Sequence, residues 1–251
     1  MLTRSLCVLL IVLAFAVPAA TPLRAEDGLS GAQKSEVEQI IRDYLLEHPE
    51  LMVEVMQRLE AKQKAAARDN ARELIGRYKT ELFKSDEDFV LNAAGKVPMV
   101  EFFDYQCGYC KKIANDVMRV TDDNANVRII FKEFPVLGDA SMVAAKAALA
   151  ARKQGKYLEF HNAMMGLRRG LSEQLIMATA ADVGLDVDRL KTDMAAPEVA
   201  ETIDKNLMLA HLMNIRGTPT LIIGDNLVPG AISYEHMQAL IDEAAAGCQA
   251  C

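Results

Sequence analysis

Residues 97–110 decide the fold of this chain and read VPMVEFFDYQCGYC. Val97 to Phe103 form an apolar run of strand length, and we expect a helix to begin at the Cys107 motif and to continue to about Val120. A second apolar run, Val127 to Phe134, follows a turn. The short links between these segments predict a strand–helix–strand unit.

The remaining pattern completes an α/β domain. Residues 86–96 are expected to be a loop. Later elements follow in this order: helices from Ser141 to about Met213, a strand at Thr220 to Ile223, a short partner strand at Leu227-Val228, and a helix from Ser233 to Ala246. We therefore expect a thioredoxin-like fold over residues 85–246, with a helical insertion at about residues 139–213.

The spacing of Cys107 and Cys110 suits thiol chemistry. A thiol at the N-terminus of a helix faces unpaired N–H groups and the positive end of the helix dipole, which favour the thiolate and lower the thiol pKa below about 8.5. We expect Cys107 to be the exposed nucleophile that attacks substrate disulfides, and Cys110 to resolve the mixed disulfide. The alternatives are a static disulfide, or half of a zinc site shared with Cys248 and Cys251, although these pairs lie farther apart than in ordinary zinc ribbons. We expect no metal or cofactor.

A proline comes directly before the strand that opens the last part of the domain. In thioredoxin-like folds a cis-proline occupies this place and faces the C-x-x-C motif, so Pro219 is the candidate. Thr218 would then offer free backbone groups to an extended substrate strand. The alternative is that Pro219 only makes a turn.

Two charged residues fall inside apolar strands. Glu101 lies within Val97 to Phe103, and Lys132 lies within Val127 to Phe134. Charges are rarely buried unless they are paired. The two residues either lie at a sheet edge in water, or pair beneath the active site and manage the proton of Cys110.

The first 25 residues have the plan of a secretory signal peptide. Arg4 precedes an unbroken apolar run from Leu6 to Val17, and small residues follow before Glu26. We place cleavage after Ala25; cleavage after Ala19 or Ala20, or an uncleaved anchor, are the alternatives. The mature chain would carry 26 basic and 35 acidic residues, a net charge of −9, which argues against nucleic-acid binding.

Residues 26–84 are predicted to be helical. Ser35 and Glu38 form a capping-box pattern at the start of one helix, and His48-Pro49 ends it. The pattern then continues from Glu50 to Phe83 without a strong turn signal, which corresponds to a helix about 50 Å long. Its apolar stripes would be buried either in an oligomerisation stalk or by folding back onto the domain.

The last five residues, 247–251, contain a second C-x-x-C pair, Cys248 and Cys251. This tail is either a mobile segment with a local disulfide or free thiols, a relay pair that passes electrons to Cys107 and Cys110, or a site that captures Cu(I) or Zn²⁺.

The run from 101 to 110, with Lys132 and Thr218-Pro219, resembles the DsbA family of bacterial periplasmic thiol–disulfide oxidoreductases. The resemblance covers about residues 85–246. It implies the following roles: nucleophile for Cys107, resolving thiol for Cys110, cis-proline for Pro219, and a buried pair for Glu101 and Lys132.

Two features differ from the strong oxidases of that family and favour disulfide isomerisation or reduction over oxidation. Gly108-Tyr109 between the cysteines and Thr218 before the proline resemble disulfide isomerases of the DsbC type, and all three would contact the substrate. Without a histidine between the cysteines, the reduced form should be less favoured and the protein less oxidising. The segment from Ile41 to Glu50 resembles the stalk of the suppressor-of-copper-sensitivity C (ScsC) branch, which includes trimeric isomerases.

These expectations describe a periplasmic protein disulfide isomerase or reductase. It would act on exported proteins that contain cysteines, through the Cys-Gly-Tyr-Cys dithiol, as a homo-oligomer with a trimer favoured. Its redox partner would be a membrane thiol donor of the DsbD type rather than a quinone-linked oxidase. The alternatives are a dithiol oxidase that introduces disulfides, and a periplasmic copper-binding protein that uses its thiolates.

Overall fold

The computed structural model describes residues 28–84, 86–168 and 170–247. The expected signal peptide, at residues 1–25, and the Cys248/Cys251 pair lie outside these residues. The chain divides into two compact units, the first ending at Leu59 and the second beginning at Glu60.

The first unit holds α1 (Gly31–Glu47) and the start of α2 (Glu50–Arg77). The capping box is made by Ser30 and Gln33, so the prediction that it lies at Ser35 was wrong. The break between α1 and α2 falls at His48-Pro49, as predicted. None of the described side chains of α1 is buried, although many of them are apolar.

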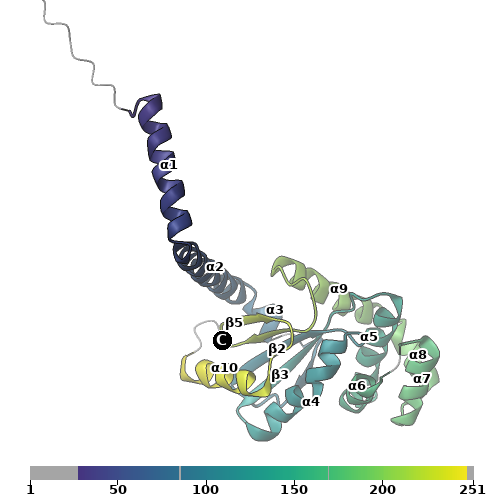
Figure 1. Ribbon diagram of the computed structural model, residues 1–251. Helices are drawn as coiled ribbons and strands as arrows, with labels where there is room; N and C mark the ends of the chain where they lie inside the picture. Colours follow the sequence, from purple (N-terminus) through teal and green to yellow (C-terminus); the bar gives the residue numbers. More distant parts are fainter. Residues whose placement is uncertain (1–27, 85, 169, 248–251) are drawn as a thin grey trace, which may run out of the picture. The chain divides into compact units, whose positions relative to one another are not determined.

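The second unit is an α/β domain (Figure 1). Its further elements are α3 (Lys79–Phe83), β1 (Phe89–Leu91), β2 (Val97–Phe103), α4 (Gly108–Asp123), β3 (Val127–Glu133), α5 (Asp139–Arg152), α6 (Tyr157–Gly166), α7 (Glu173–Asp182), α8 (Val187–Met194), α9 (Pro197–Leu212), β4 (Thr220–Ile223), β5 (Asn226–Pro229) and α10 (Tyr234–Gly247). The fold class is therefore the predicted one. Strand β1 lies where we expected only a loop, because Phe89 to Leu91 pair with Phe131 to Ile129 of β3.

The five strands form one mixed sheet in the order β1-β3-β2-β4-β5. Strands β2 and β3 are parallel, and the other neighbours are antiparallel. In the parallel register Glu101 lies opposite Phe131, and Phe102 lies opposite Lys132. Successive residues of a strand point to opposite faces, so Glu101 and Lys132 belong to opposite faces of the sheet.

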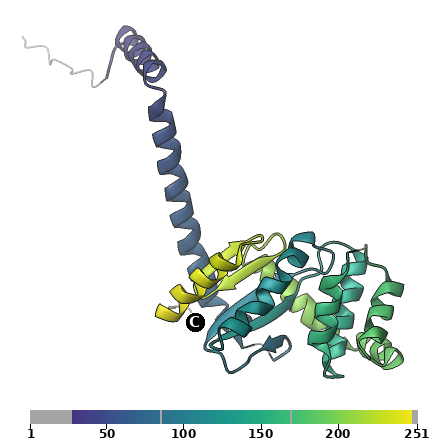
Figure 2. The ribbon, with the colours of Figure 1, turned by 60° about the horizontal axis from the view of Figure 1, so that its bottom comes forward.

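Each face of the sheet has its own apolar core. On one face, α4 and α10 pack over a cluster that includes Met99, Ile129 and Leu221, and Figure 2 shows the two helices on the sheet. On the other face, α3 and α9 pack over Val100, Phe102 and Ile130. Every residue of the central strand β2 is buried, which is why its sequence is apolar apart from Glu101.

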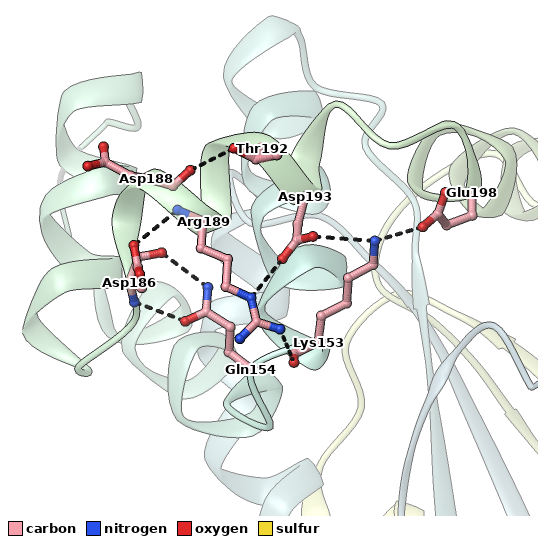
Figure 3. Close-up of polar contacts among 8 residues, drawn as sticks. All are labelled: Lys153, Gln154, Asp186, Asp188, Arg189, Thr192, Asp193 and Glu198. Carbon is pink, nitrogen blue, oxygen red and sulfur yellow. Dashed lines mark hydrogen bonds and ion pairs between the residues drawn. The ribbon is translucent and has the colours of Figure 1, made fainter.

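Helices α5 to α8 of the insertion gather at one end of the sheet in both views, and α9 leads from them back over the face that carries Val100 and Phe102 (Figures 1 and 2). Polar contacts join the end of α5 to α8 and α9 (Figure 3). Lys153 forms ion pairs with Asp193 at 3.5 Å and with Glu198 at 2.7 Å, and Arg189 donates to the carbonyl of Lys153 at 3.1 Å. These contacts join the end of α5 to α8 and to the start of α9.

The end of α2 belongs to the second unit. Ile75, Leu82 and Phe83 are buried against the sheet face that carries Val100 and Phe102. The second unit therefore starts upstream of residue 85, where we expected the domain to begin. Within the described residues, no helix combines the length and the apolar character that a membrane span requires.

Candidate redox site

Cys107 is the N-cap of α4. Its Sγ accepts a hydrogen bond from the backbone N–H of Cys110 at 3.4 Å and donates to the carbonyl of Thr218 at 3.2 Å. Both cysteines are free thiols, and Cys107 is 7% exposed while Cys110 is fully buried. The prediction of an exposed Cys107 was therefore wrong, because this side chain is largely buried. Its sulfur is the more accessible of the two, yet it packs beneath the Thr218 carbonyl.

The peptide bond between Thr218 and Pro219 is cis, as the resemblance implied. The loop around it is fixed by its own contacts, because the Thr220 hydroxyl donates to the carbonyl of Gly217 at 2.8 Å and the Gly230 N–H donates to the carbonyl of Pro219 at 2.8 Å. This loop brings residue 218, distant in the chain, against the sulfur of Cys107.

Glu101 carries a buried carboxyl. It is 2% exposed, and among the residues that the structure describes its Oε1 has no hydrogen-bond partner. Burial raises its pKa to about 8. Burial also raises the pKa of the Cys110 thiol, and the charge of Glu101 raises it further. Glu101 and Cys110 therefore interact on the face of the sheet that α4 covers.

Lys132 does not pair with Glu101, so this prediction was wrong. It lies on the opposite face of the sheet, where its Nζ forms an ion pair with Asp88 and donates to the carbonyl of Glu81 at 2.7 Å. Asn206 donates to the second oxygen of Asp88 at 3.1 Å. The physical reason is the register of β2 and β3, which separates the two charges by the thickness of the sheet.

Asp104 is a buried residue of the site that sequence reasoning missed. Its carboxylate accepts hydrogen bonds from the N–H groups of Gln106 (2.7 Å), Val136 (2.8 Å) and Leu137 (2.9 Å), and from the hydroxyl of Ser141 (2.6 Å). It therefore ties the segment before Cys107 to the loop that follows β3. The available signal was an acidic residue placed between aromatic residues in the motif.

Sequence reasoning also missed a second buried network of hydrogen bonds. The carboxyl of Glu133 accepts from the hydroxyls of Tyr157 at 2.8 Å and Tyr105 at 3.2 Å, and the Tyr105 oxygen lies 3.1 Å from Nδ1 of His161. Burial raises the pKa of Glu133 well above its usual range and lowers the pKa of His161 to about 3. The network joins the helical insertion to the segment that carries Cys107.

The two residues between the cysteines are open to a partner molecule. Tyr109 is 66% exposed, and a Cβ added at Gly108 would meet no atom of the described residues within 4 Å. Within residues 28–84, 86–168 and 170–247, no three His, Cys, Asp or Glu side chains are grouped so that they could hold a metal ion.

Comparison with known protein families identifies the family of this chain. The DSBA-like thioredoxin domain matches residues 99–242. The chain belongs to the DsbA-like thioredoxin family. The N-terminal domain of the copper resistance protein ScsC matches residues 33–66, so the family member is of the ScsC type.

Solved structures agree with this assignment. A thioredoxin-like oxidoreductase from Silicibacter pomeroyi is 41% identical with a TM-score of 0.66, and the alignment covers 67% of this chain and 98% of that one. A linker-deletion mutant of ScsC from Proteus mirabilis is 25% identical with a TM-score of 0.67, covering 88% of this chain and 99% of the other.

A curated relative shares only part of its length with this chain. The Na(+)/H(+) antiporter NhaA 1 of Salinispora arenicola is 29% identical over 153 residues, which is 60% of this chain and 24% of the antiporter. The chain thus spans about a quarter of the length of the first curated relatives it matches.

Proposed function

We propose that this chain is a periplasmic thiol–disulfide oxidoreductase that works as a disulfide isomerase or reductase on exported proteins. The observation that carries the proposal is the contact of the helix-capping Cys107 with both Thr218 and Cys110. The donated N–H of Cys110 and the helix terminus favour negative charge on the sulfur of Cys107. The family of the chain and the oxidoreductase among its structural relatives support the same chemistry.

The chemical steps follow from the two thiols. The Cys107 thiolate attacks one sulfur of a substrate disulfide, forms a Cys107–substrate disulfide, and releases the other substrate sulfur as a thiolate. In reduction, the Cys110 thiolate then attacks Cys107, releases the second substrate thiol, and leaves a Cys107–Cys110 disulfide. In isomerisation, another thiol of the substrate releases Cys107 instead, and the enzyme returns to its dithiol form without net oxidation.

Glu101 supports the second step. Cys110 is buried and its pKa is raised, so its proton needs an acceptor before it can attack. A carboxyl whose pKa lies near the working pH is suited to take that proton and to give it back when the disulfide is reduced. Lys132 has no part in this step, because it lies across the sheet.

The direction of catalysis is inferred from the residues around the dithiol. Gly108 and Tyr109 place no positive charge between the cysteines, so the thiolate receives no stabilisation there and the disulfide form is less oxidising. A membrane dithiol donor would then keep the enzyme reduced.

Repair of a scrambled protein tests this direction. Ribonuclease with randomly paired disulfides is incubated with the protein in a glutathione buffer, and the recovery of ribonuclease activity is followed. We expect fast recovery. Rapid oxidation of reduced ribonuclease without repair of the scrambled form would instead identify a dithiol oxidase.

The N-terminal helices suggest assembly into an oligomer, and the family resemblance favours a trimer. In α1, Ile40, Ile41 and Leu46 are each more than half exposed, and a helix does not keep such side chains in water without a partner. Sedimentation of the full chain should show an oligomer that Ile41→Asp with Leu45→Asp converts to a monomer. A wild-type monomer would refute the proposal.

A further inference from the structure

A polar groove runs along α4 on the side that packs against α6 (Figure 1). Its volume is about 340 Å³. The α4 side contributes Lys111 and Asn115, which lie one turn apart and therefore share a face of the helix. The other side contributes Asn162 of α6 and Arg168, which follows α6. The groove is therefore lined by side-chain amides and by positive charge.

One end of the groove lies close to the nucleophile. The N–H of Lys111 donates to the carbonyl of Cys107 at 3.1 Å, so Lys111 follows Cys107 by one helical turn. Residues at this spacing are neighbours on a helix surface, with about 5 to 6 Å between their Cβ atoms. The Nζ of Lys111 donates to the carbonyl of Leu167 at 2.8 Å, which holds the ammonium group beside the segment that carries Arg168.

The positive charge at this end is not neutralised by an ion pair. Within residues 28–84, 86–168 and 170–247, neither Lys111 nor Arg168 forms an ion pair with a carboxylate. Lys111 is half-buried, and its burial and the charge of Arg168 lower its pKa, against the opposing charge of Asp104. Two cations that repel each other in a partly dehydrated place are stabilised by an anion between them.

The other charges of the groove favour an anion at the end near Cys107. Arg119 is already engaged, because its Nε donates to Asp123 at 3.0 Å and its guanidinium lies 4.1 Å from the ring centre of Tyr234. Asp122 lines the groove three turns after Lys111, about 16 Å along the helix, and would repel an anion there. The groove is therefore positive toward the dithiol and negative at its other end.

We propose that Lys111 and Arg168, called here the basic pair, bind a carboxylate of the substrate, which is the side chain of an Asp or Glu a few residues from the reacting cysteine. An extended chain advances about 3.3 Å per residue, so a residue two positions from that cysteine reaches one helical turn away. The formal net charge of the chain is −7, so attraction of an acidic segment requires a local site. The inference rests on the proposed thiol–disulfide activity and names its substrate class.

Three peptides test this inference. Each carries one cysteine in a mixed disulfide with 2-mercaptoethanol, which is uncharged. The first peptide has Glu two residues before and two residues after the cysteine, the second has Gln at both places, and the third has both Glu residues eight positions away. The full-length reduced protein releases peptide and 2-mercaptoethanol as thiols and becomes a Cys107–Cys110 disulfide, so single-turnover rates can be compared. Rates with dithiothreitol give the intrinsic reactivity of each peptide.

The wild type should prefer the peptide whose Glu residues lie near the cysteine. Relative to dithiothreitol, the first peptide should react about threefold to fivefold faster than the second at low ionic strength, which is the effect of a partly exposed ion pair. The third peptide should react no faster than the second, because its carboxylates do not reach the basic pair. In 1 M salt, where the screening length is about 3 Å, the preference should fall below about twofold.

Two variants separate the basic pair from positive charge in general. Lys111→Gln with Arg168→Gln should nearly abolish the preference. Lys112→Gln with Lys191→Gln removes the same amount of charge and should keep it, because Lys112 lines a different groove, between α4 and the start of α10, and Lys191 belongs to α8. Each protein is judged by the ratio of two peptide rates, so a change in the reactivity of Cys107 itself cancels.

Equal wild-type rates with the first two peptides would overturn the inference and leave the oxidoreductase activity standing. A third peptide as fast as the first would overturn it too, since attraction would then need no local site. The same holds for a preference that persists without the basic pair, or that is lost equally in the Lys112/Lys191 variant. A wild type that reacts with none of the peptides would instead overturn the proposed function.

Discussion

Glu101 and Lys132 are both 2% exposed and lie on neighbouring strands, but they have different surroundings on the two faces of the sheet. Lys132 has an ion-pair partner in Asp88 and a carbonyl acceptor in Glu81. Glu101 has one carboxyl oxygen with no hydrogen-bond partner in the described part of the chain, and it lies on the face that holds the dithiol.

A buried charge that is fully partnered holds a structure in place, whereas a buried carboxyl left without a partner keeps a proton that can move. We therefore assign a structural role to Lys132. Its contacts with Asp88 and Glu81 join the segment before β1 to the sheet. We propose the chemical role for the face of Glu101, because this carboxyl lies on the face that holds Cys110 and burial raises the pKa of both groups.

Removing the ammonium group of Lys132 should have the largest effect on the free energy of unfolding. Lys132→Met leaves Asp88 buried without its counter-charge, so the free energy of unfolding should fall by about 3 to 5 kcal/mol, measured by urea denaturation. Lys132→Met combined with Asp88→Asn should recover part of this loss. The folded Lys132→Met protein should keep its exchange rate; a large drop in that rate would contradict the structural role.

Replacing the carboxyl of Glu101 should raise the stability of the protein, whereas the change at Lys132 lowers it. Folded Glu101 keeps its proton up to about pH 8, while the unfolded residue loses it near pH 4.3, so wild-type stability falls as the pH rises through this window. Glu101→Gln lacks this penalty. Its stability relative to wild type should therefore grow by a few kcal/mol between pH 5 and pH 8. A difference that does not depend on pH would show that Glu101 is not buried as a neutral acid.

The same substitution should slow the chemistry. Glu101→Gln removes the acceptor for the Cys110 proton, and loss of a positioned base costs a factor of about 100 or more in rate. Stopped-flow measurement should show slow resolution of the mixed disulfide and loss of the rise in rate between pH 7 and pH 9. Formation of the mixed disulfide at Cys107 should change little. Unchanged resolution would remove Glu101 from the mechanism.

An exposed ion pair beside Asp88 should have the smallest effect. Lys205 pairs with Glu87, the neighbour of Asp88 in the chain, and both side chains are largely open to water. Because water screens exposed pairs, Lys205→Gln should leave the unfolding midpoint unchanged within error. A loss comparable to that of Lys132→Met would mean that burial does not decide the strength of these pairs.

The sequence predicted the elements that local pattern determines. Val97 to Phe103 are buried throughout and form β2, and Cys107 begins a helix. The cis bond before Pro219 was expected from the family resemblance and not from local pattern. The start of α1 was misplaced because Ser30-Gln33 and Ser35-Glu38 both fit a capping box, and pattern alone does not choose between them.

Contacts that depend on tertiary register could not be predicted. A shift of one residue between β2 and β3 would bring Glu101 and Lys132 to the same face. Because both strands are buried on both faces, their apolar pattern does not fix that register. Asp88 and Asp104 were missed for a related reason. Their partners Lys132 and Val136 lie 44 and 32 residues away in the chain.

The division of labour between the two thiols is tested most directly by trapping the mixed disulfide. Full-length Cys110→Ser and Cys107→Ser proteins are each mixed with a peptide disulfide, and intact masses are recorded. The Cys110→Ser protein should accumulate one peptide, attached to Cys107 and released by a reductant, while the Cys107→Ser protein should accumulate none at Cys110. A peptide attached to Cys110 as readily as to Cys107, or to neither, would contradict the account.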